Sequence, residues 1–383
     1  AGIHQRRQEV VAQLAKGVRT LLDKNKVEVM HGRGRLRSAS EIEIAGGEPV
    51  ALANPRAIVL ATGSRPTEIP AAPRDGTHIL NSDDILNLKQ APARLIILGG
   101  GYIGCEFASI FARLGSEVTL IELEPRLLPG MDRDLAQVLQ RHFKQAGIIL
   151  HLSKRLEQAV AGDGVVVTLD DGTEIQGDQL LVAVGRTPNT GDLGLEQAGV
   201  ELEGHSIRVN DYMETTAPGI FAIGDVTGKM QLAHVATAQG RVVVDNLLDP
   251  SAGVSMDYAQ VPAAVFTHPE IATIGLSTAA AEAQGLPVQT GRFPFAAIGK
   301  ALAAGETDGF VKLIAHAETG QLLGGHIIGG HAAELIGQIT LAIKLGATAR
   351  QLAETIFAHP TLSEAVLEAA EGTFGPATHT VRR

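Results

Sequence analysis

A histidine and a glutamate near the carboxyl end of the chain are the residues best suited to move a proton. They are His359 and Glu364, in the stretch His-Pro-Thr-Leu-Ser-Glu. A histidine titrates near neutral pH and can take a proton from a thiol, and a nearby carboxylate would hold its imidazole in the useful tautomer. The same stretch also permits a purely structural role, because Thr361 and Glu364 have the spacing of a helix capping box.

A glycine-rich turn at residues 99–104 could bind a phosphate. Its sequence fits G-x-G-x-x-G, follows an apolar run and opens a helical pattern. Gly99 allows the tight turn, Gly101 lets the backbone approach a pyrophosphate, and Gly104 lets helix and strand pack closely. Glu122 ends the next apolar run 23 residues after Gly99, where a carboxylate would bind the adenosine ribose and repel a 2′-phosphate. These features predict an NAD site; the alternative is an ordinary turn with a surface glutamate.

Strands and helices must position these groups, and hydrophobic periodicity predicts where they lie. Apolar residues three and four positions apart predict an amphipathic helix over about 8–24, and the strand, turn, helix and strand from 94 to 122 predict a complete βαβ unit. The other expected strands lie at 27–30, 41–44, 57–61, near 148, 165 and 180, and at 220–223, 263–267, 311–315 and 322–328. The other expected helices cover about 132–146 and 233–248 and begin near 332, 349 and 361.

Length, charge and cysteine content limit the possible classes of protein. A chain of 383 residues predicts two or three domains, and a net charge of -10 disfavours nucleic acid and anionic membranes as partners. The apolar runs are far shorter than the roughly 20 residues that span a bilayer. The single cysteine, Cys105, excludes an intramolecular disulfide or a cysteine-rich zinc site and is expected to be a buried, inert thiol. We expect a soluble, cytoplasmic protein without a metal site.

Several motifs resemble those of the pyridine nucleotide-disulfide oxidoreductases. Residues 61–64, Ala-Thr-Gly-Ser, resemble the element that closes the family's FAD domain, and residues 183–189 resemble its counterpart after the NAD domain. Either could be a plain glycine turn. Residues 222–225, Ala-Ile-Gly-Asp, resemble the segment whose carboxylate holds the ribityl chain of FAD, although an aspartate there could also be a turn residue. Residues 231–234 resemble the segment against the flavin ring, and 359–364 the active-site signature.

The resemblance implies a set of binding and catalytic residues. It implies NAD contacts at Gly99, Gly101, Tyr102, Ile103, Gly104, Glu106, Glu122, Leu156 and Gly185, and FAD contacts at Gly34, Thr62, Gly63, Ser64, Asp225, Gln231, Leu232, Ala233 and His234. It also implies that Glu106 lies near the nicotinamide and the flavin, that His359 is the base, and that Glu364 orients it. In the family this pair reaches across a two-fold interface, which implies a homodimer.

The same resemblance implies an α/β fold in which a Rossmann-like NAD domain is inserted in a truncated FAD domain. The expected boundaries are 1–70 for the first part of the FAD domain, 71–188 for the NAD domain, 189–256 for the rest of the FAD domain, and 257–383 for an α+β dimerisation domain. Residues 189–256 hold too little core to stand alone and should pack on the amino-terminal segment.

Within the family, the signature at 359–364 points to the dihydrolipoamide dehydrogenase branch, which oxidises dihydrolipoamide, free or on a lipoyl domain, with FAD and NAD. The sequence lacks that branch's first G-x-G-x-x-G and its C-x-x-x-x-C redox disulfide. We therefore expect the chain as given to be a shortened form that does not reduce lipoamide. Two alternatives stay open: another flavin disulfide reductase, of the glutathione or mercuric type, and a flavin-free NAD-binding module.

Overall fold

The computed structural model describes residues 2–46 and 50–380. These residues form two compact units. Unit 1 contains the chain up to Thr67, Leu86–Gln90 and Arg186–Met256. Unit 2 contains Glu68–Ile85, Ala91–Gly185 and the chain from Asp257 onward. Within the described residues, no helix combines the length and the apolar content that crossing a bilayer requires.

Unit 1 brings the amino-terminal segment together with residues 186–256. Its strands pair across these segments: β4 (Ile58–Leu60) runs parallel to β17 (Ile220–Ala222), and β5 (Ser64–Pro66) runs antiparallel to β14 (Arg186–Pro188). The remaining elements of unit 1 are α1 (Gly2–Lys24), β1 (Arg33–Ser38), β2 (Glu41–Ala45), β3 (Val50–Ala53), η1 (Glu196–Ala198), β15 (Leu202–Glu203), β16 (Ser206–Ile207), η2 (Gly224–Thr227) and α5 (Ala233–Leu248). The core of the unit includes Leu36, Ile58, Met213, Ile220 and Val243.

Two expectations about the start of the chain were inaccurate. Helix α1 begins at Gly2, six residues before the expected start at Gln8, and it buries no residue within the described chain. Residues 27–30 do not form a strand; the first strand is β1, which pairs antiparallel with β2. The apolar side chains of Val27 and Val29 remain exposed, whereas Leu36 of β1 is buried, and burial decides which segment becomes a strand.

The first half of unit 2 is built on a parallel sheet with the strand order β6-β13-β7-β8-β9. These strands are β6 (Ile79–Leu80), β13 (Gln179–Val182), β7 (Arg94–Leu98), β8 (Glu117–Glu122) and β9 (Ile149–Leu152). The sheet is accompanied by α2 (Ser82–Ile85), α3 (Tyr102–Arg113), α4 (Arg133–Gln145), and an antiparallel sheet of β10 (Leu156–Gly162), β11 (Gly164–Leu169) and β12 (Glu174–Gly177). From β7 the chain adds β8 and β9 on one side and later β13 on the other. Ligands of such sheets bind at the carboxyl ends of the strands where the order reverses.

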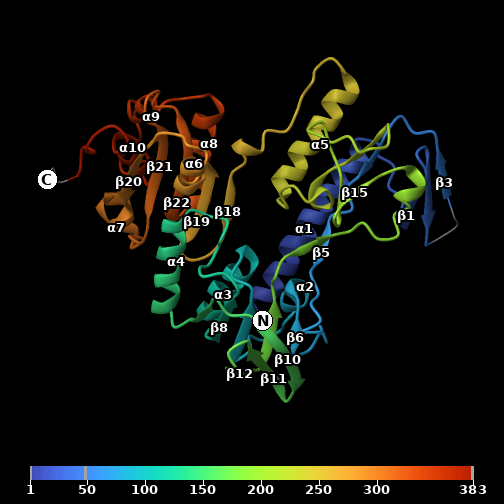
Figure 1. Ribbon diagram of the computed structural model, residues 1–383, viewed down its shortest axis with the longest axis horizontal. Helices are drawn as coiled ribbons and strands as arrows, with labels where there is room; N and C mark the ends of the chain where they lie inside the picture. Colours follow the sequence, from blue (N-terminus) through green and yellow to red (C-terminus); the bar gives the residue numbers. More distant parts are fainter. Residues whose placement is uncertain (1, 47–49, 381–383) are drawn as a thin grey trace. The chain divides into compact units, whose positions relative to one another are not determined.

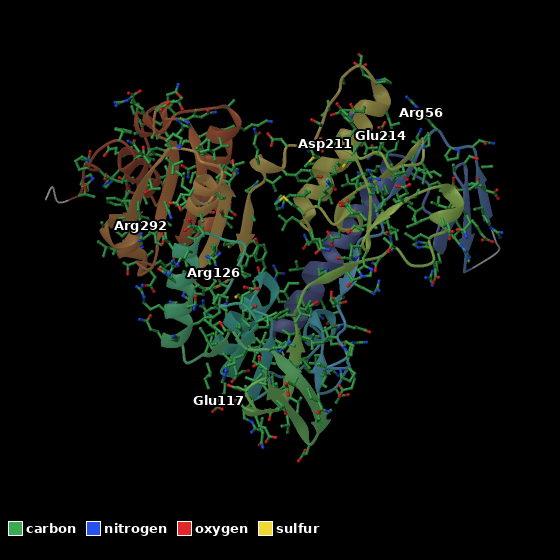
Figure 2. The ribbon with its side chains drawn as sticks, in the orientation of Figure 1. Arg56, Glu117, Arg126, Asp211, Glu214 and Arg292 are labelled. Atoms are coloured by element: carbon green, nitrogen blue, oxygen red, sulfur yellow. The ribbon has the colours of Figure 1, made fainter. Side chains whose placement is uncertain are left out.

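The second half of unit 2 is an antiparallel sheet with the order β18-β19-β22-β21-β20. Its strands are β18 (Ala263–Val265), β19 (Glu270–Gly275), β20 (Val288–Pro294), β21 (Phe310–His316) and β22 (Leu322–Gly329). Helix α8 (Ala332–Lys344) packs on β19 and β22, and α10 (Glu364–Glu371) packs on β20 and β21 (Figure 1). The smaller elements are η3 (Tyr258–Gln260), α6 (Thr278–Ala283), η4 (Phe295–Ala297), α7 (Gly299–Ala304) and α9 (Ala349–Ala353). Charged side chains such as Arg292 of β20 lie on the surface (Figure 2).

The last helix begins later than the sequence predicted. Helix α10 starts at Glu364 rather than near Thr361. The hydroxyl of Thr361 donates to the carbonyl oxygen of Ala358, so it does not cap the helix, although the Thr361 N–H does donate to Glu364. A reciprocal capping box forms instead between Thr348 and Gln351, at the start of α9. Of the two hydrogen bonds of a capping box at residues 361–364, only the one from the Thr361 N–H to Glu364 forms. It uses Oε2 of the Glu364 carboxylate, so Oε1 is available to another partner.

A buried ionic cluster joins the two halves of unit 2. Lys312 of β21 is 7% exposed, and its Nζ lies 3.0 Å from Asp132 Oδ2 and 2.8 Å from Asp134 Oδ2. Asp132 also caps α4, because its side chain accepts the N–H of Asp134. The lysine of the antiparallel sheet is thus bound to the first turn of a helix that packs on the parallel sheet.

Candidate functional site

The glycine-rich turn lies between β7 and α3, at the carboxyl end of the parallel sheet. Gly99 has φ +107°, and a Cβ there would lie 2.4 Å from the carbonyl oxygen of Ala183, which follows β13. A Cβ on Gly104 would lie 1.8 Å from the carbonyl oxygen of Gly99. Gly101 is the N-cap of α3 and makes no side-chain capping bond, so the first N–H groups of the helix are not capped by that residue. The turn therefore needs glycine, and it sits where β13 meets β7.

The carboxylate of Glu122 is fixed against this turn. Glu122 is 8% exposed at the end of β8. Its Oε2 accepts the N–H of Gly100 at 2.5 Å, and its Oε1 accepts the N–H of Glu124 at 2.8 Å. Each oxygen keeps a lone pair for a further donor, such as a ribose hydroxyl. The structure thus places the predicted acid beside the predicted phosphate turn.

Cys105 is buried next to the same turn. Its thiol donates to the carbonyl oxygen of Gly100, and burial, together with the nearby carboxylates of Glu122 and Glu106, raises its pKa. A thiol with a raised pKa is a poor nucleophile. The expectation of a buried thiol is confirmed, and we assign Cys105 no redox chemistry.

The other predicted NAD residues lie around the turn in different settings. Glu106, one turn into α3, accepts the N–H of Phe266 on Oε1 at 2.8 Å, and burial raises its pKa. Gly185 follows β13 with φ +119°. The side chain of Leu156 belongs to the core around the parallel sheet, so only its backbone could reach a nucleotide. Tyr102 is partly exposed at the start of α3, next to Ile103.

In unit 1, the structure brings two of the predicted FAD segments together. The hydroxyl of Ser64 donates to Asp225 Oδ2 at 2.5 Å. Arg186 donates to the Ser64 hydroxyl at 2.7 Å and to the Ser64 carbonyl oxygen at 2.9 Å. Thr62 donates to the carbonyl oxygen of Asn189 at 2.8 Å, beside Gly63, whose φ is +68°. Sequence reasoning missed the part played by Arg186, although the motif at 183–189 contains it.

The remaining predicted FAD residues lie in β1 and at the start of α5. Gly34 lies in β1 and pairs with Ile44 of β2. Gln231 and Leu232 precede α5, and Ala233 and His234 form its first turn. A further residue that sequence reasoning missed is Gln239 of α5, which is fully buried and accepts the N–H of Gly224 at 2.6 Å, next to Asp225.

His359 and Glu364 form the predicted pair at the start of α10. His359 Nδ1 lies 2.8 Å from Glu364 Oε1, and Glu364 Oε2 accepts the N–H of Thr361 at 2.9 Å. The Thr361 N–H, followed by the imidazole, holds the pKa of Glu364 below its usual range. The His359 side chain is 78% exposed. Because Nδ1 faces the carboxylate, Nε2 is the nitrogen that can exchange a proton with a substrate.

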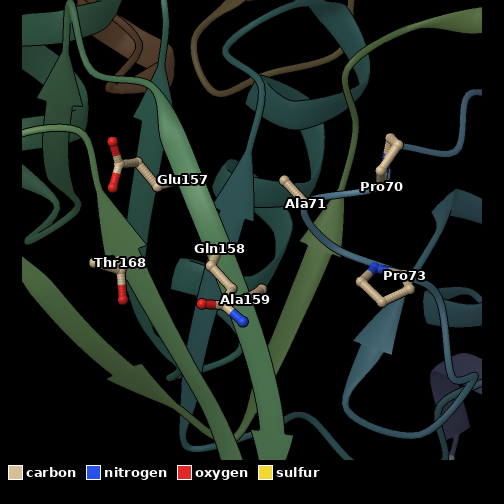
Figure 3. Close-up of a pocket in the computed structure, with 7 residues that line it drawn as sticks. All are labelled: Pro70, Ala71, Pro73, Glu157, Gln158, Ala159 and Thr168. Carbon is tan, nitrogen blue, oxygen red and sulfur yellow. The ribbon is translucent and has the colours of Figure 1, made fainter.

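A pocket of about 450 Å³ lies elsewhere in unit 2, beside the proline-rich segment. Figure 3 shows Pro70, Ala71 and Pro73 on one side of it, and β10 residues 157–159 with Thr168 of β11 on the other. None of the predicted site residues lines this pocket, so we assign it no chemistry.

Two family models match the chain. The model described as pyridine nucleotide-disulphide oxidoreductase matches residues 1–240, and the dimerisation domain of the same group matches residues 261–370. The chain therefore belongs to the pyridine nucleotide-disulphide oxidoreductase family. This membership confirms the expected α/β fold with a dimerisation domain, and it makes the protein an oxidoreductase of a family that uses FAD and NAD.

The similar curated proteins include dihydrolipoyl dehydrogenases. The one from Chlamydia muridarum is 43% identical over 370 residues, which cover 96% of this chain and 79% of that protein. The one from Geobacillus stearothermophilus is 38% identical over 391 residues, covering 100% and 82%. Among solved structures, LpdA from Mycobacterium tuberculosis superposes with a TM-score of 0.90 at 32% identity, covering 96% of this chain and 82% of that chain. The HOCl-induced flavoprotein disulfide reductase RclA from Escherichia coli has a TM-score of 0.87 at 30% identity, covering 96% and 85%. The expected resemblance to dihydrolipoamide dehydrogenase is confirmed.

The residues present supply groups that fit both cofactors. For NAD, the chain supplies a turn that needs glycine at residues 99 and 104 and a buried carboxylate beside it. For FAD, it supplies the Ser64, Arg186 and Asp225 group, which suits a polyol chain.

Proposed function

We propose that this chain carries the NAD site and the proton-transfer pair of an enzyme that oxidises dihydrolipoamide, free or on a lipoyl domain. The observation that supports this most is the turn at residues 99–104 with Glu122 fixed beside it. A homodimer is part of the proposal, because family members dimerise through the domain that residues 261–370 match. A cytoplasmic location is also part of it, since one cysteine allows no intramolecular disulfide.

NAD is expected to lie with its pyrophosphate at the start of α3 and its adenosine ribose against Glu122. Uncapped N–H groups and the helix dipole attract a phosphate there, and Gly101 leaves space for its approach. Glu122 would accept the ribose hydroxyls and repel a 2′-phosphate, which favours NAD over NADP. Glu106, one helical turn further along α3, would face the nicotinamide end.

FAD, when bound, would supply an acceptor for electron pairs, with Ser64 and Asp225 of this chain holding its ribityl hydroxyls. Arg186 keeps the Ser64 hydroxyl directed at Asp225. His359 would act as the general base, because its Nε2 would take a proton from a substrate thiol. Glu364 would keep Nδ1 protonated and stabilise the imidazolium that results.

Replacing Glu122 with alanine tests the NAD site. We expect the affinity for NAD, measured by isothermal titration calorimetry, to fall about 10- to 100-fold, because hydrogen bonds to a charged group contribute about 1.5–3 kcal/mol. The preference for NAD over NADP should narrow at the same time. Glu124→Ala is the matched control, since the Glu124 side chain is exposed and the residue binds Glu122 through its backbone N–H, which alanine keeps. Unchanged NAD affinity in Glu122→Ala would contradict the assignment.

Replacing His359 with glutamine tests the proton-transfer pair. In an enzyme preparation that oxidises dihydrolipoamide, we expect thiol oxidation to slow about 10²- to 10⁴-fold, while NADH-to-dye transfer stays near the wild-type rate. His379→Gln is a useful control, because His379 is also an exposed histidine bound to a glutamate of α10. An equal loss in both assays would show that His359 has a structural role.

A flavin-free NAD-binding module is the second candidate. The observation that favours it is that the glycine-rich turn and Glu122 both lie in unit 2, whereas Ser64 and Asp225 lie in unit 1. Visible flavin absorbance in the purified chain separates the two candidates: bound flavin supports the oxidoreductase, and NAD binding without flavin supports the module.

A further inference from the structure

Two side chains on one face of α3 bind the segment that joins β18 to β19. Glu106 Oε1 accepts the N–H of Phe266 at 2.8 Å, and Ser109 Oγ accepts the N–H of His268 at 2.9 Å. Residues three apart on a helix face the same way, so these two contacts lie side by side. Both belong to unit 2, and together they fix residues 266–268 against the helix that begins at the glycine-rich turn.

The segment between these two contacts has little freedom of its own. Thr267 is 4% exposed, and its hydroxyl donates to the carbonyl oxygen of Pro269 at 2.7 Å. Ser109 is 7% exposed, so its hydroxyl is shielded from water that could replace the bond to His268. Without that hydroxyl, one of these two side-chain hydrogen bonds would remain among the described residues, the bond from the Phe266 N–H to the Glu106 carboxylate.

The bond to Phe266 also sets the direction of the Glu106 carboxylate. Its Oε1 is occupied by the Phe266 N–H, which leaves Oε2 for a ligand. The position of that N–H depends on the segment, and the segment depends on Ser109. A shift of the segment would therefore turn the carboxylate, whereas none of the hydrogen bonds of the described residues joins the segment to Glu122 or to the turn at residues 99–104.

We propose that Ser109 is a positioning residue for the nicotinamide end of NAD, acting through Phe266 on Glu106. This inference rests on the proposed NAD site. In this proposal, different residues bind the two ends of NAD. The turn and Glu122 bind the pyrophosphate and the adenosine ribose, and Glu106 lies near the nicotinamide. Loss of the Ser109 hydroxyl weakens the binding of NAD and leaves ADP-ribose, which lacks the nicotinamide, unaffected.

The test measures the affinity of both ligands by calorimetry for the wild type and Ser109→Ala. We expect a loss of about 3- to 10-fold for NAD, the size of one neutral hydrogen bond, and less than about 2-fold for ADP-ribose. Ser109→Thr keeps a hydroxyl and should recover most of the NAD affinity. Ser116→Ala is the matched control, because Ser116 is 8% exposed and its hydroxyl donates to the carbonyl oxygen of Pro92, away from the segment. That control should lower the melting temperature without changing either affinity.

Any other result would overturn either the role of Ser109 or the proposed NAD site. Equal weakening of both ligands in Ser109→Ala would mean that the serine only supports the fold, and no change in either would mean that the segment does not position Glu106. Both results overturn the role of Ser109 and leave the NAD site standing. A folded wild-type chain that binds neither ligand would overturn the proposed NAD site and, with it, this inference.

Discussion

A Gly104→Ala chain is expected to bind NAD at least about 100-fold more weakly than the wild type, which corresponds to about 2.7 kcal/mol. The added Cβ would lie 1.8 Å from the carbonyl oxygen of Gly99, and a backbone atom cannot move aside as a flexible side chain can. The start of α3 must therefore shift away from the turn, and the N–H groups that would bind the pyrophosphate shift with it. Overpacking of this kind also lowers the free energy of unfolding by about 1–3 kcal/mol.

Two further glycine variants distinguish a loss of NAD affinity from a loss of unfolding free energy. Gly101→Ala meets no atom within 4 Å, so it should unfold as the wild type does yet lose NAD, because its methyl group occupies the approach of the pyrophosphate. Gly130→Ala also has open space around it and should change neither property. Calorimetry and urea unfolding of the three variants measure both effects. Wild-type NAD affinity in Gly104→Ala would show that the nucleotide does not bind at this turn.

A Lys312→Met chain is expected to lose about 3–5 kcal/mol of unfolding free energy. Lys312 is buried between Asp132 and Asp134, and methionine fills its volume but leaves the buried Asp132 carboxylate without a cation. An uncompensated buried charge is among the most destabilising changes known for single substitutions. The transition midpoint in urea, followed by circular dichroism, measures the loss.

Two control variants distinguish the effect of the lost lysine charge from the effect of the changed side-chain shape. Lys300→Met makes the same chemical change at an exposed position of α7 and should cost little. Adding Asp132→Asn to Lys312→Met should recover part of the loss, because it removes the uncompensated charge. A loss in Lys312→Met no larger than that in Lys300→Met would show that the ionic cluster contributes little to the junction within unit 2.

The βαβ unit was predictable because all of its signals are local. An apolar run, three glycines, a helical pattern and an acid follow one another within 30 residues, and the structure places them at β7, α3 and β8. The pair at 359 and 364 was found in the same way, since the two residues are neighbours in sequence.

Strand β1 was missed because its pattern is misleading. Its residues 33–38 include three arginines and a glycine, and only Leu36 is buried. Without a partner strand in view, such a segment resembles a polar turn, and it becomes a strand only through pairing with β2.

Residues that act through distant partners could not be found from sequence. Arg186 binds Ser64, which lies 122 positions away, and Ser109 binds the backbone of His268, 159 positions away. A serine inside an amphipathic helix carries no sign of such a contact, because the partner is a backbone N–H that every residue except proline has.

The two backbone bonds to Glu122 have a consequence for how a nucleotide would associate. A carboxylate that is already immobilised loses almost no conformational entropy when a ribose arrives, so the association free energy is not reduced by the ordering of that side chain. In such a preorganised site, substitutions alter mainly how fast the ligand leaves rather than how fast it arrives. Glu122, at the end of β8, would therefore determine chiefly how long the bound nucleotide stays in the site.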